Sequence, residues 1–270
     1  MTGKPPAMNV LMIGNSFSIS CMTYLPKVAA DFGVDLDLMS LYIGGCPLEK
    51  HCQNLELCAA DPSLKPYRSD RETRGGGRVI GEEDIATALG LAKWDVVTIQ
   101  QASHLSWVPD SYHPFGDKLV ETIRRLAPQA EIVVQETWSY TPFDRRLADW
   151  GLTPDEMYAK LHAAYGLFAA GYGFRVIPTG AAVQAFRKAL PVRYAENSFG
   201  GDVVGGKGGK PLPDCDVFHL NEDGEYLQAL VWAATLFGRD PRACGFVPQG
   251  LDGKRADAIK EAAFAATAGR

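Results

Sequence analysis

The chain has 270 residues, of which 46% are hydrophobic and 22% are charged, as expected for a globular protein with a sizeable core. Its formal net charge of −5 argues against nucleic acid or an anionic membrane as the main partner. No apolar run approaches the roughly 20 residues of a membrane-spanning helix, and the first residues contain no signal-peptide segment. We therefore expect a cytoplasmic protein, unless a leader has been lost.

The first predicted element is a strand over 10–13, which ends in Gly14-Asn15-Ser16 and turns at once into a helical pattern over 16–32. This places Ser16 at a helix N-terminus and at the carboxyl edge of a sheet, where open α/β folds hold their sites. On this stretch alone, capping the helix is the more common role for a serine. The free N–H groups of a helix N-terminus would also favour a developing negative charge.

The rest of the chain alternates strand and helix patterns, which predicts one domain with a parallel sheet covered by helices on both faces. Strand patterns follow at 36–43, 94–101, 131–136 and 174–178, and helical patterns at 48–57, 82–91, 116–126, 154–170, 181–190, 222–237 and 254–268. Residues 60–81 are polar and predict a hairpin or a surface flap. The glycine-rich stretch 197–213 predicts a mobile loop.

The cysteines predict neither a metal site nor a redox motif, because they form no C-x-x-C pair and no histidine spacing typical of zinc. We expect free thiols, with a disulfide as the alternative, and we expect no cofactor. The six positions are Cys21, Cys46, Cys52, Cys58, Cys215 and Cys244.

Polar residues follow several predicted strands at the same edge of the sheet. A serine nucleophile needs a base, a group that orients that base, and N–H donors aimed at the oxyanion. The chain supplies candidates for each of these roles: Ser16 after the first strand, Gly44 and Gly45 after the second, Gln100, Gln101 and Ser103 after the third, and Asp216 and His219 before a long helix.

These motifs resemble those of the SGNH, or GDSL-type, hydrolases. The resemblance rests on the Ser16 turn, on the Gly44-Gly45 turn, and on a block near the C-terminus, all in the family's order. That block reads Asp216-Val217-Phe218-His219-Leu220-Asn221. Together with Trp94-Asp95 and Gln100-Gln101, the chain is most similar to a bacterial subgroup described as a domain of unknown function.

The resemblance implies a three-layer α/β/α sandwich around a flavodoxin-like, five-stranded parallel sheet. It also implies that Ser16 is the nucleophile, His219 its base and Asp216 the group that orients His219. Two blocks depart from the family: Gly-Asp-Ser becomes Gly14-Asn15-Ser16, and the third block, Gly-x-Asn-Asp, is replaced by 100–103. Since a glutamine amide can donate in place of asparagine, the expected oxyanion donors are the N–H groups of Ser16 and Gly45 and the side chain of Gln101, with Gln100 in reserve.

The predicted function is hydrolysis of a short-chain or carbohydrate-linked ester through an acyl-enzyme. An acyltransferase and a non-catalytic binding module of the same fold are the alternatives, and the altered third block favours the module. Several loop residues could contact substrate or could serve packing and the surface: Gln100, Ser103, His104, Trp107 and Trp138. The sequence leaves the substrate and the oligomeric state open.

Overall fold

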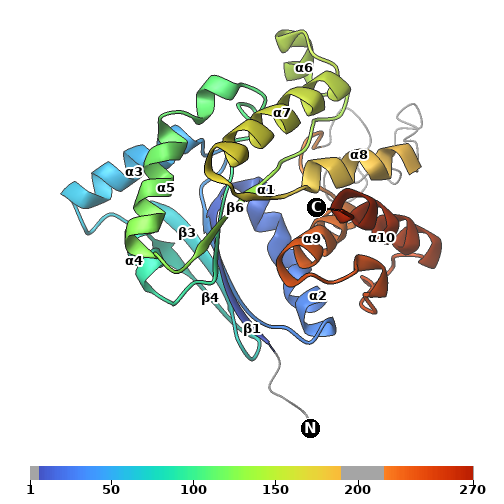
Figure 1. Cartoon of the computed structure of the whole chain (residues 1–270), viewed down its shortest axis with the longest axis horizontal. Coiled ribbons are helices and arrows are strands. Elements are labelled where there is room, and N and C mark those ends of the chain that lie inside the picture. The colour runs from blue at the N-terminus through green and yellow to red at the C-terminus, as the bar shows by residue number, and fades with distance from the viewer. Residues whose placement is uncertain (1–5, 190–215, 270) are drawn as a thin grey trace.

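The sheet has β1 at its centre, and this order brings the polar segments together. The computed structural model describes residues 6–189 and 216–269 (Figure 1). Within them the sheet order is β4-β3-β2-β1-β5-β6-β7. The strands are β1 (Ala7–Gly14), β2 (Asp35–Tyr42), β3 (Tyr67–Thr73), β4 (Gly77–Glu83), β5 (Val96–Ile99), β6 (Glu131–Gln135) and β7 (Arg175–Ile177).

The five predicted parallel strands are confirmed. β2, β1, β5, β6 and β7 run parallel in that order, so that the carboxyl ends of β1, β2 and β5 lie side by side. The apolar residues of β1 explain its central position, since Val10, Leu11 and Met12 are completely buried. A strand that is covered on both faces in this way is typical of parallel sheets.

Helices cover both faces of the sheet, which confirms the three-layer architecture (Figure 1). The α-helices are α1 (Ser16–Ile19), α2 (Leu25–Asp31), α3 (Leu48–Ala60), α4 (Ile85–Gly90), α5 (Phe115–Leu126), α6 (Arg145–Trp150), α7 (Pro154–Tyr172), α8 (Thr179–Ala189), α9 (Glu222–Phe237) and α10 (Gly253–Thr267). Short 3₁₀ turns are η1 (Ser20–Thr23), η2 (Pro109–Tyr112) and η5 (Pro241–Ala243). The layer with α3, α4 and α5 lies opposite the layer with α2 and α9 (Figure 1).

The polar segment around 60–81 forms the hairpin of β3 and β4, which extends the sheet beyond β2 with antiparallel pairing. The hairpin continues to Glu83, and the prediction of a helix from residue 82 is therefore wrong at its start. Glu82 and Glu83 pair with Arg68 and Tyr67 across the hairpin. The helix begins only after Asp84, whose Oδ1 atom accepts the N–H of Thr87 at 2.9 Å as an N-cap.

The predicted helix over 16–32 is divided into α1, η1 and α2. Pro26 explains the break, because its ring has no N–H to donate and clashes with the carbonyl four residues earlier in a continuous helix. Tyr24 leaves the helical region at φ −127°, and α2 restarts with proline in its first turn. The break leaves α1 as a short segment that starts at Ser16.

The predictions for the cysteines and for the glycine-rich stretch can be compared with the structure only within the described residues. Cys21, Cys46, Cys52, Cys58 and Cys244 are free thiols. Cys215 and the glycine-rich stretch 197–213 lie outside the described residues. No helix in the described part of the chain is long and apolar enough to span a membrane.

Candidate active site

Ser16 lies where β1 turns into α1. Asn15 is extended and caps α1, with its Oδ1 atom accepting the N–H of Phe17 at 3.0 Å. Gly14 permits this sharp turn, because a Cβ atom there would lie 2.4 Å from the Ser18 hydroxyl and 3.2 Å from the Gln100 side chain. Ser16 itself is half-buried, and its side chain lines a cavity.

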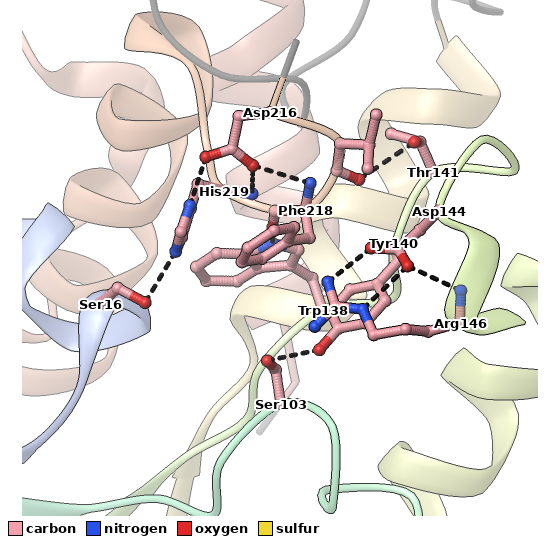
Figure 2. A network of polar contacts seen from close by, with 11 residues as sticks. Ser16, Ser103, Trp138, Tyr140, Thr141, Asp144, Arg146, Asp216, Phe218 and His219 are labelled. Carbon is pink, nitrogen blue, oxygen red and sulfur yellow. Dashed lines mark hydrogen bonds and ion pairs between the residues drawn. The ribbon is translucent and has the colours of Figure 1, made fainter. Parts of the chain in front are cut away.

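A chain of hydrogen bonds joins Ser16, His219 and Asp216 (Figure 2). The Nε2 atom of His219 lies 2.8 Å from the Ser16 hydroxyl, and its Nδ1 atom bonds to Oδ2 of Asp216. The other carboxylate oxygen accepts the backbone N–H groups of Phe218 at 3.1 Å and His219 at 3.0 Å. The bond at Nδ1 fixes the ring so that Nε2 faces the hydroxyl and can accept its proton.

The Asp216 carboxylate stays ionised in spite of its partial burial. Burial alone would raise its pKa, but the hydrogen bonds from the His219 ring and backbone outweigh that effect and hold the pKa of Asp216 below its usual value. A negative charge at this position stabilises the imidazolium form of His219. The arrangement can therefore withdraw a proton from a serine hydroxyl.

The segment that follows β6 holds the Asp216–His219 turn in place (Figure 2). The indole N–H of Trp138 donates to the carbonyl of Phe218 at 2.8 Å. Thr141 donates its backbone N–H and its hydroxyl to the carbonyl of Val217, at 3.1 and 3.0 Å. Trp138 also stacks on Phe17, one residue after Ser16, with ring centroids 4.1 Å apart. One buried side chain thus contacts both halves of the site.

Arg146 packs against the Phe218 ring and belongs to the same network of polar contacts (Figure 2). Its guanidinium group lies over the rings of both Tyr140 and Phe218, 4.3 and 4.4 Å from their centroids, and pairs with Asp144. Thr141, Asp144 and Arg146 were not predicted as site residues. Their sequence carries no signal for this role, since each is recognisable only through its contacts.

The Gly44-Gly45 turn lies next to the Ser16 turn. Gly45 adopts φ +61°, a left-handed conformation that favours glycine, and the turn closes with a bond from Cys46 N to Ile43 O at 3.3 Å. The side-chain amide of Asn15 donates to the carbonyl of Cys46 at 3.1 Å. Among the described residues, the Gly45 N–H meets no hydrogen-bond acceptor; Gly45 is exposed and is not one of the residues that line the cavity beside Ser16.

The expectation that Gln101 donates to the oxyanion needs correction. Both hydrogens of its amide are engaged, by the carbonyl of Ser111 at 2.8 Å and by the Ser111 hydroxyl at 3.0 Å. Its oxygen accepts the backbone N–H groups of Leu48 and Ala102. Gln101 therefore ties three loops together and has no N–H left for a substrate. Gln100 points instead at Asn15, with 2.7 Å between its Nε2 atom and Oδ1 of Asn15.

The cavity beside Ser16 has a volume of about 660 Å³ and a polar, charged wall. One side is formed by α1, η1 and α2, and the other by the β3–β4 hairpin. The cations that line it are Lys27, Arg68 and Arg78; the acids, apart from Asp216, are Asp70, Glu72 and Glu225; the apolar residues are Ile19, Met22 and Leu220. The sequence predicted a hairpin or a surface flap over 60–81, but it did not predict which of its residues line the cavity.

None of the residues named as possible substrate contacts lines this cavity, and the contacts of several of them fit the alternative role in packing. Trp138 is completely buried, and Ser103 is bonded to the Tyr140 hydroxyl at 2.7 Å. Trp107 packs on Trp150, with ring centroids 5.4 Å apart. Burial, together with the Arg146 cation, lowers the pKa of His104, which is half-buried in the same loop. No group of three or more potential metal ligands occurs in residues 6–189 or 216–269.

Comparisons with known proteins agree with this fold. A family model described as a domain of unknown function (DUF4886) matches residues 9–266. A solved DUF4886 family protein from Bacteroides uniformis is 28% identical, with a TM-score of 0.81 over 96% of this chain and 94% of that chain. A comparison with curated proteins finds no match.

Two more distant structures show the same fold. A candidate SGNH hydrolase from Slackia heliotrinireducens is 22% identical, with a TM-score of 0.54 over 85% of this chain and 99% of its own. A candidate GDSL-like lipase from Parabacteroides merdae is 12% identical, with a TM-score of 0.52 over 88% of this chain and 99% of its own. The fold is that of the SGNH hydrolases.

Proposed function

Because this chain belongs to the DUF4886 family and has the SGNH hydrolase fold, we propose that it is a serine ester hydrolase that acts on a small, polar ester. The observation that carries the proposal is the hydrogen-bonded chain from the Ser16 hydroxyl through His219 to Asp216. A nucleophile, a base and a group that orients the base are the parts that acyl transfer requires.

The reaction proceeds in two halves. His219 takes the proton of the Ser16 hydroxyl while Oγ of Ser16 forms a bond to the carbonyl carbon of the ester. The π-electron pair of the carbonyl group moves to the carbonyl oxygen, which becomes the oxyanion. This intermediate collapses, the bond to the alcohol breaks, and His219 gives its proton to the departing alcohol. In the second half, His219 takes a proton from a water molecule, whose oxygen attacks the carbonyl carbon of the acyl-enzyme. The bond to Ser16 then breaks, His219 returns the proton to Ser16, and the acid is released.

The oxyanion is stabilised by backbone donors. Ser16 is the first residue of α1 and offers its backbone N–H at the start of this short helix, where the first N–H groups have no partner within the helix. The N–H of Gly45 is the second donor, on the neighbouring turn. Preorganised donors of this kind need no reorganisation as the negative charge develops on the oxygen.

The cavity wall favours a short acyl group and a hydroxyl-rich alcohol, such as a carbohydrate. Charged side chains from the hairpin and α2 line one side of the cavity, and a long alkyl chain against them would displace their water without replacing its hydrogen bonds. Planar carboxylates and guanidinium groups present the paired donors and acceptors that neighbouring hydroxyl groups match. Arg68 on the hairpin provides such donors, whereas the paired N–H groups of Arg78 are bonded to the Asp70 carboxylate at 2.8 and 2.6 Å.

The proposal is tested with p-nitrophenyl acetate. The wild-type protein should hydrolyse it, and Ser16→Ala should not exceed the spontaneous rate. Ser20→Ala is a matched control, because Ser20 lines the same cavity but its hydroxyl donates to Gln228 at 2.7 Å instead of facing His219. Equal rates for wild type and Ser16→Ala would overturn the proposal.

A non-catalytic binding module is the rival function, and the engaged amide of Gln101 is the observation that favours it. A folded wild-type protein that binds acetylated sugars but releases no acetate would support that rival. An acyltransferase would hydrolyse the ester slowly and would transfer the acyl group to an added alcohol. Product analysis with and without the alcohol separates the two enzymes.

A further inference from the structure

Asn15 connects three segments that are distant in the sequence. Its side-chain oxygen accepts the N–H of Phe17 at 3.0 Å and the amide of Gln100 at 2.7 Å. Its side-chain nitrogen donates to the carbonyl of Cys46 at 3.1 Å. The residue is 1% exposed. It therefore links the Ser16 turn to the Gly45–Cys46 turn and to the segment after β5.

The partners of Asn15 determine which way its amide faces. Phe17 offers an N–H, which requires an oxygen, and Cys46 offers a carbonyl, which requires a donor. An amide supplies both, whereas a carboxylate supplies acceptors only. The aspartate of the usual Gly-Asp-Ser sequence could cap α1 equally well but could not, when ionised, donate to Cys46.

Gln100 donates a hydrogen bond to the Asn15 side chain and so helps to orient it. Its amide reaches Asn15 across Gly14, where a Cβ atom would lie only 3.2 Å from the Gln100 carboxamide carbon. The glycine thus allows the approach. Gln100 is 2% exposed and does not line the cavity, so its amide acts on Asn15 and not on a ligand.

We propose that Asn15 is a positioning residue that fixes the spacing between the Ser16 and Gly45 N–H groups, with Gln100 orienting Asn15 in turn. This inference rests on the proposed function. Ser16 directly follows Asn15, and Gly45 directly precedes Cys46, so the bond from Asn15 to the Cys46 carbonyl spans the two donors of the oxyanion site. The glutamine after β5 then supports the oxyanion site through Asn15, in place of the direct donor of the family's third block.

The informative variant is Asn15→Asp, which keeps the size and the helix cap of Asn15 but places a carboxylate oxygen against the Cys46 carbonyl. Ionised, the new side chain repels that carbonyl and moves the turn; protonated, it can donate again. At about pH 8 we expect kcat to fall on the order of 100-fold, close to the effect of losing one oxyanion donor, with KM little changed. The ratio of variant to wild-type kcat should recover at least about tenfold towards pH 5, as the carboxyl binds a proton.

Other groups near position 15 do not reproduce this pH dependence. Burial raises the pKa of the Cys46 thiol to about 12 and lowers that of His51, beside Cys46, to about 4, so neither changes charge between about pH 5 and pH 8. The ratio of variant to wild-type kcat compares two proteins that differ by this one ionisable group. Rates are read at the isosbestic wavelength of nitrophenol, which makes them independent of its ionisation.

Asn9→Asp is the matched control. The Asn9 amide also donates to a backbone carbonyl, that of Lys93 at 2.8 Å, but at the opposite end of β1. It should retain wild-type kcat at every pH. Gln100→Leu should lower kcat in the same direction as Asn15→Asp, but without recovery in acid, because it introduces no ionisable group.

The outcomes separate this inference from the proposed function. A folded wild-type protein without esterase activity would reject the function. An active wild type with an Asn15→Asp variant of equal kcat would reject the positioning role alone. A variant with lowered kcat and a constant ratio from pH 8 to pH 5 would also reject it, since general disruption of the fold would not be relieved by one proton. Thermal melting of each variant confirms that folded proteins are compared.

Discussion

The Nε2 atom of His219 lies 2.8 Å from the hydroxyl of Ser16, although 203 residues separate them in the chain. Ser16 belongs to the first turn after the central strand, and His219 to the segment that enters α9. Each is held by its own contacts: Asn15 caps the turn at Ser16, and Asp216 fixes the ring of His219. A substitution that removes one of these supporting contacts should therefore lower the rate of ester hydrolysis, although Ser16, His219 and Asp216 are all still present.

Trp138 provides the first prediction. Trp138→Phe removes the bond to the Phe218 carbonyl and loosens the Asp216–His219 turn. We expect kcat to fall on the order of tenfold to a hundredfold with a small change in KM, because a displacement of about 1 Å has effects of this size. Steady-state kinetics with p-nitrophenyl acetate measures both values.

Trp107→Phe is the control for this change. It removes the same volume, but the Trp107 N–H has no hydrogen-bond partner within the described residues. Its kcat should remain within about twofold of wild type. Equal losses in both variants would show that packing, and not the bond to Phe218, supports the site.

Gln101 should affect stability more than catalysis. Gln101→Leu leaves the backbone N–H of Leu48 and the carbonyl of Ser111 without partners, and we expect the free energy of unfolding to fall by about 3 kcal/mol. Urea denaturation measures this change. Gln249→Leu, at an exposed position, should change it by less than about 0.5 kcal/mol. A Gln101→Leu variant of unchanged stability with a kcat lowered on the order of 100-fold would instead restore the oxyanion role.

The acyl chain length is predicted from the charged cavity wall. Among p-nitrophenyl esters, kcat/KM should be at least about tenfold higher for acetate than for octanoate, since the longer chain would desolvate charged groups. Arg68→Leu, on the cavity side of the hairpin, should reduce this preference. Arg74→Leu should not, because Arg74 belongs to the same hairpin but does not line the cavity. A wild-type preference for octanoate would contradict the polar assignment.

His51 should make the protein sensitive to acid. It is completely buried, and burial lowers its pKa from 6.5 to about 4. Between about pH 6.5 and pH 4 the unfolded chain therefore binds a proton at His51 that the folded protein does not bind. The free energy of unfolding falls as the pH drops through this range, by about 3 kcal/mol in total. His51→Gln should remove this part of the loss, measured by denaturation at several pH values. His113→Gln, at an exposed histidine, should not; an unchanged pH dependence in His51→Gln would contradict the prediction.

The sequence predicted the parallel strands because their residues are buried on both faces and therefore apolar, as in Val10–Ile13. The sequence did not decide between a hairpin and a surface flap over 60–81. The strands carry Arg68, Asp70 and Glu72 on the face that lines the cavity, and these residues remove the apolar alternation of an ordinary strand. The break in the helix after Ser16 could have been predicted from Pro26. Periodicity alone concealed it.

Ser16, Asp216 and His219 were predictable because their residue types and their order match the motifs of the hydrolase family that the sequence resembles, and the structure brings them together. Gln101 was misassigned because two adjacent glutamines look alike in a sequence. Their roles diverge only through partners on distant loops, Ser111 for Gln101 and Asn15 for Gln100. For Trp138 the sequence left substrate contact and packing as alternatives, and its actual contact, a bond to the Phe218 carbonyl, depends on the folded segment after β6.

Covalent labelling tests the nucleophile most directly. The wild-type protein is incubated with a fluorophosphonate, and intact mass and peptide mapping locate the adduct. The account predicts one adduct, on Ser16, that forms more slowly in His219→Ala and is absent in Ser16→Ala, whereas Ser20→Ala is labelled like the wild type. A folded wild-type protein that remains unlabelled, or an adduct on another serine, would contradict it.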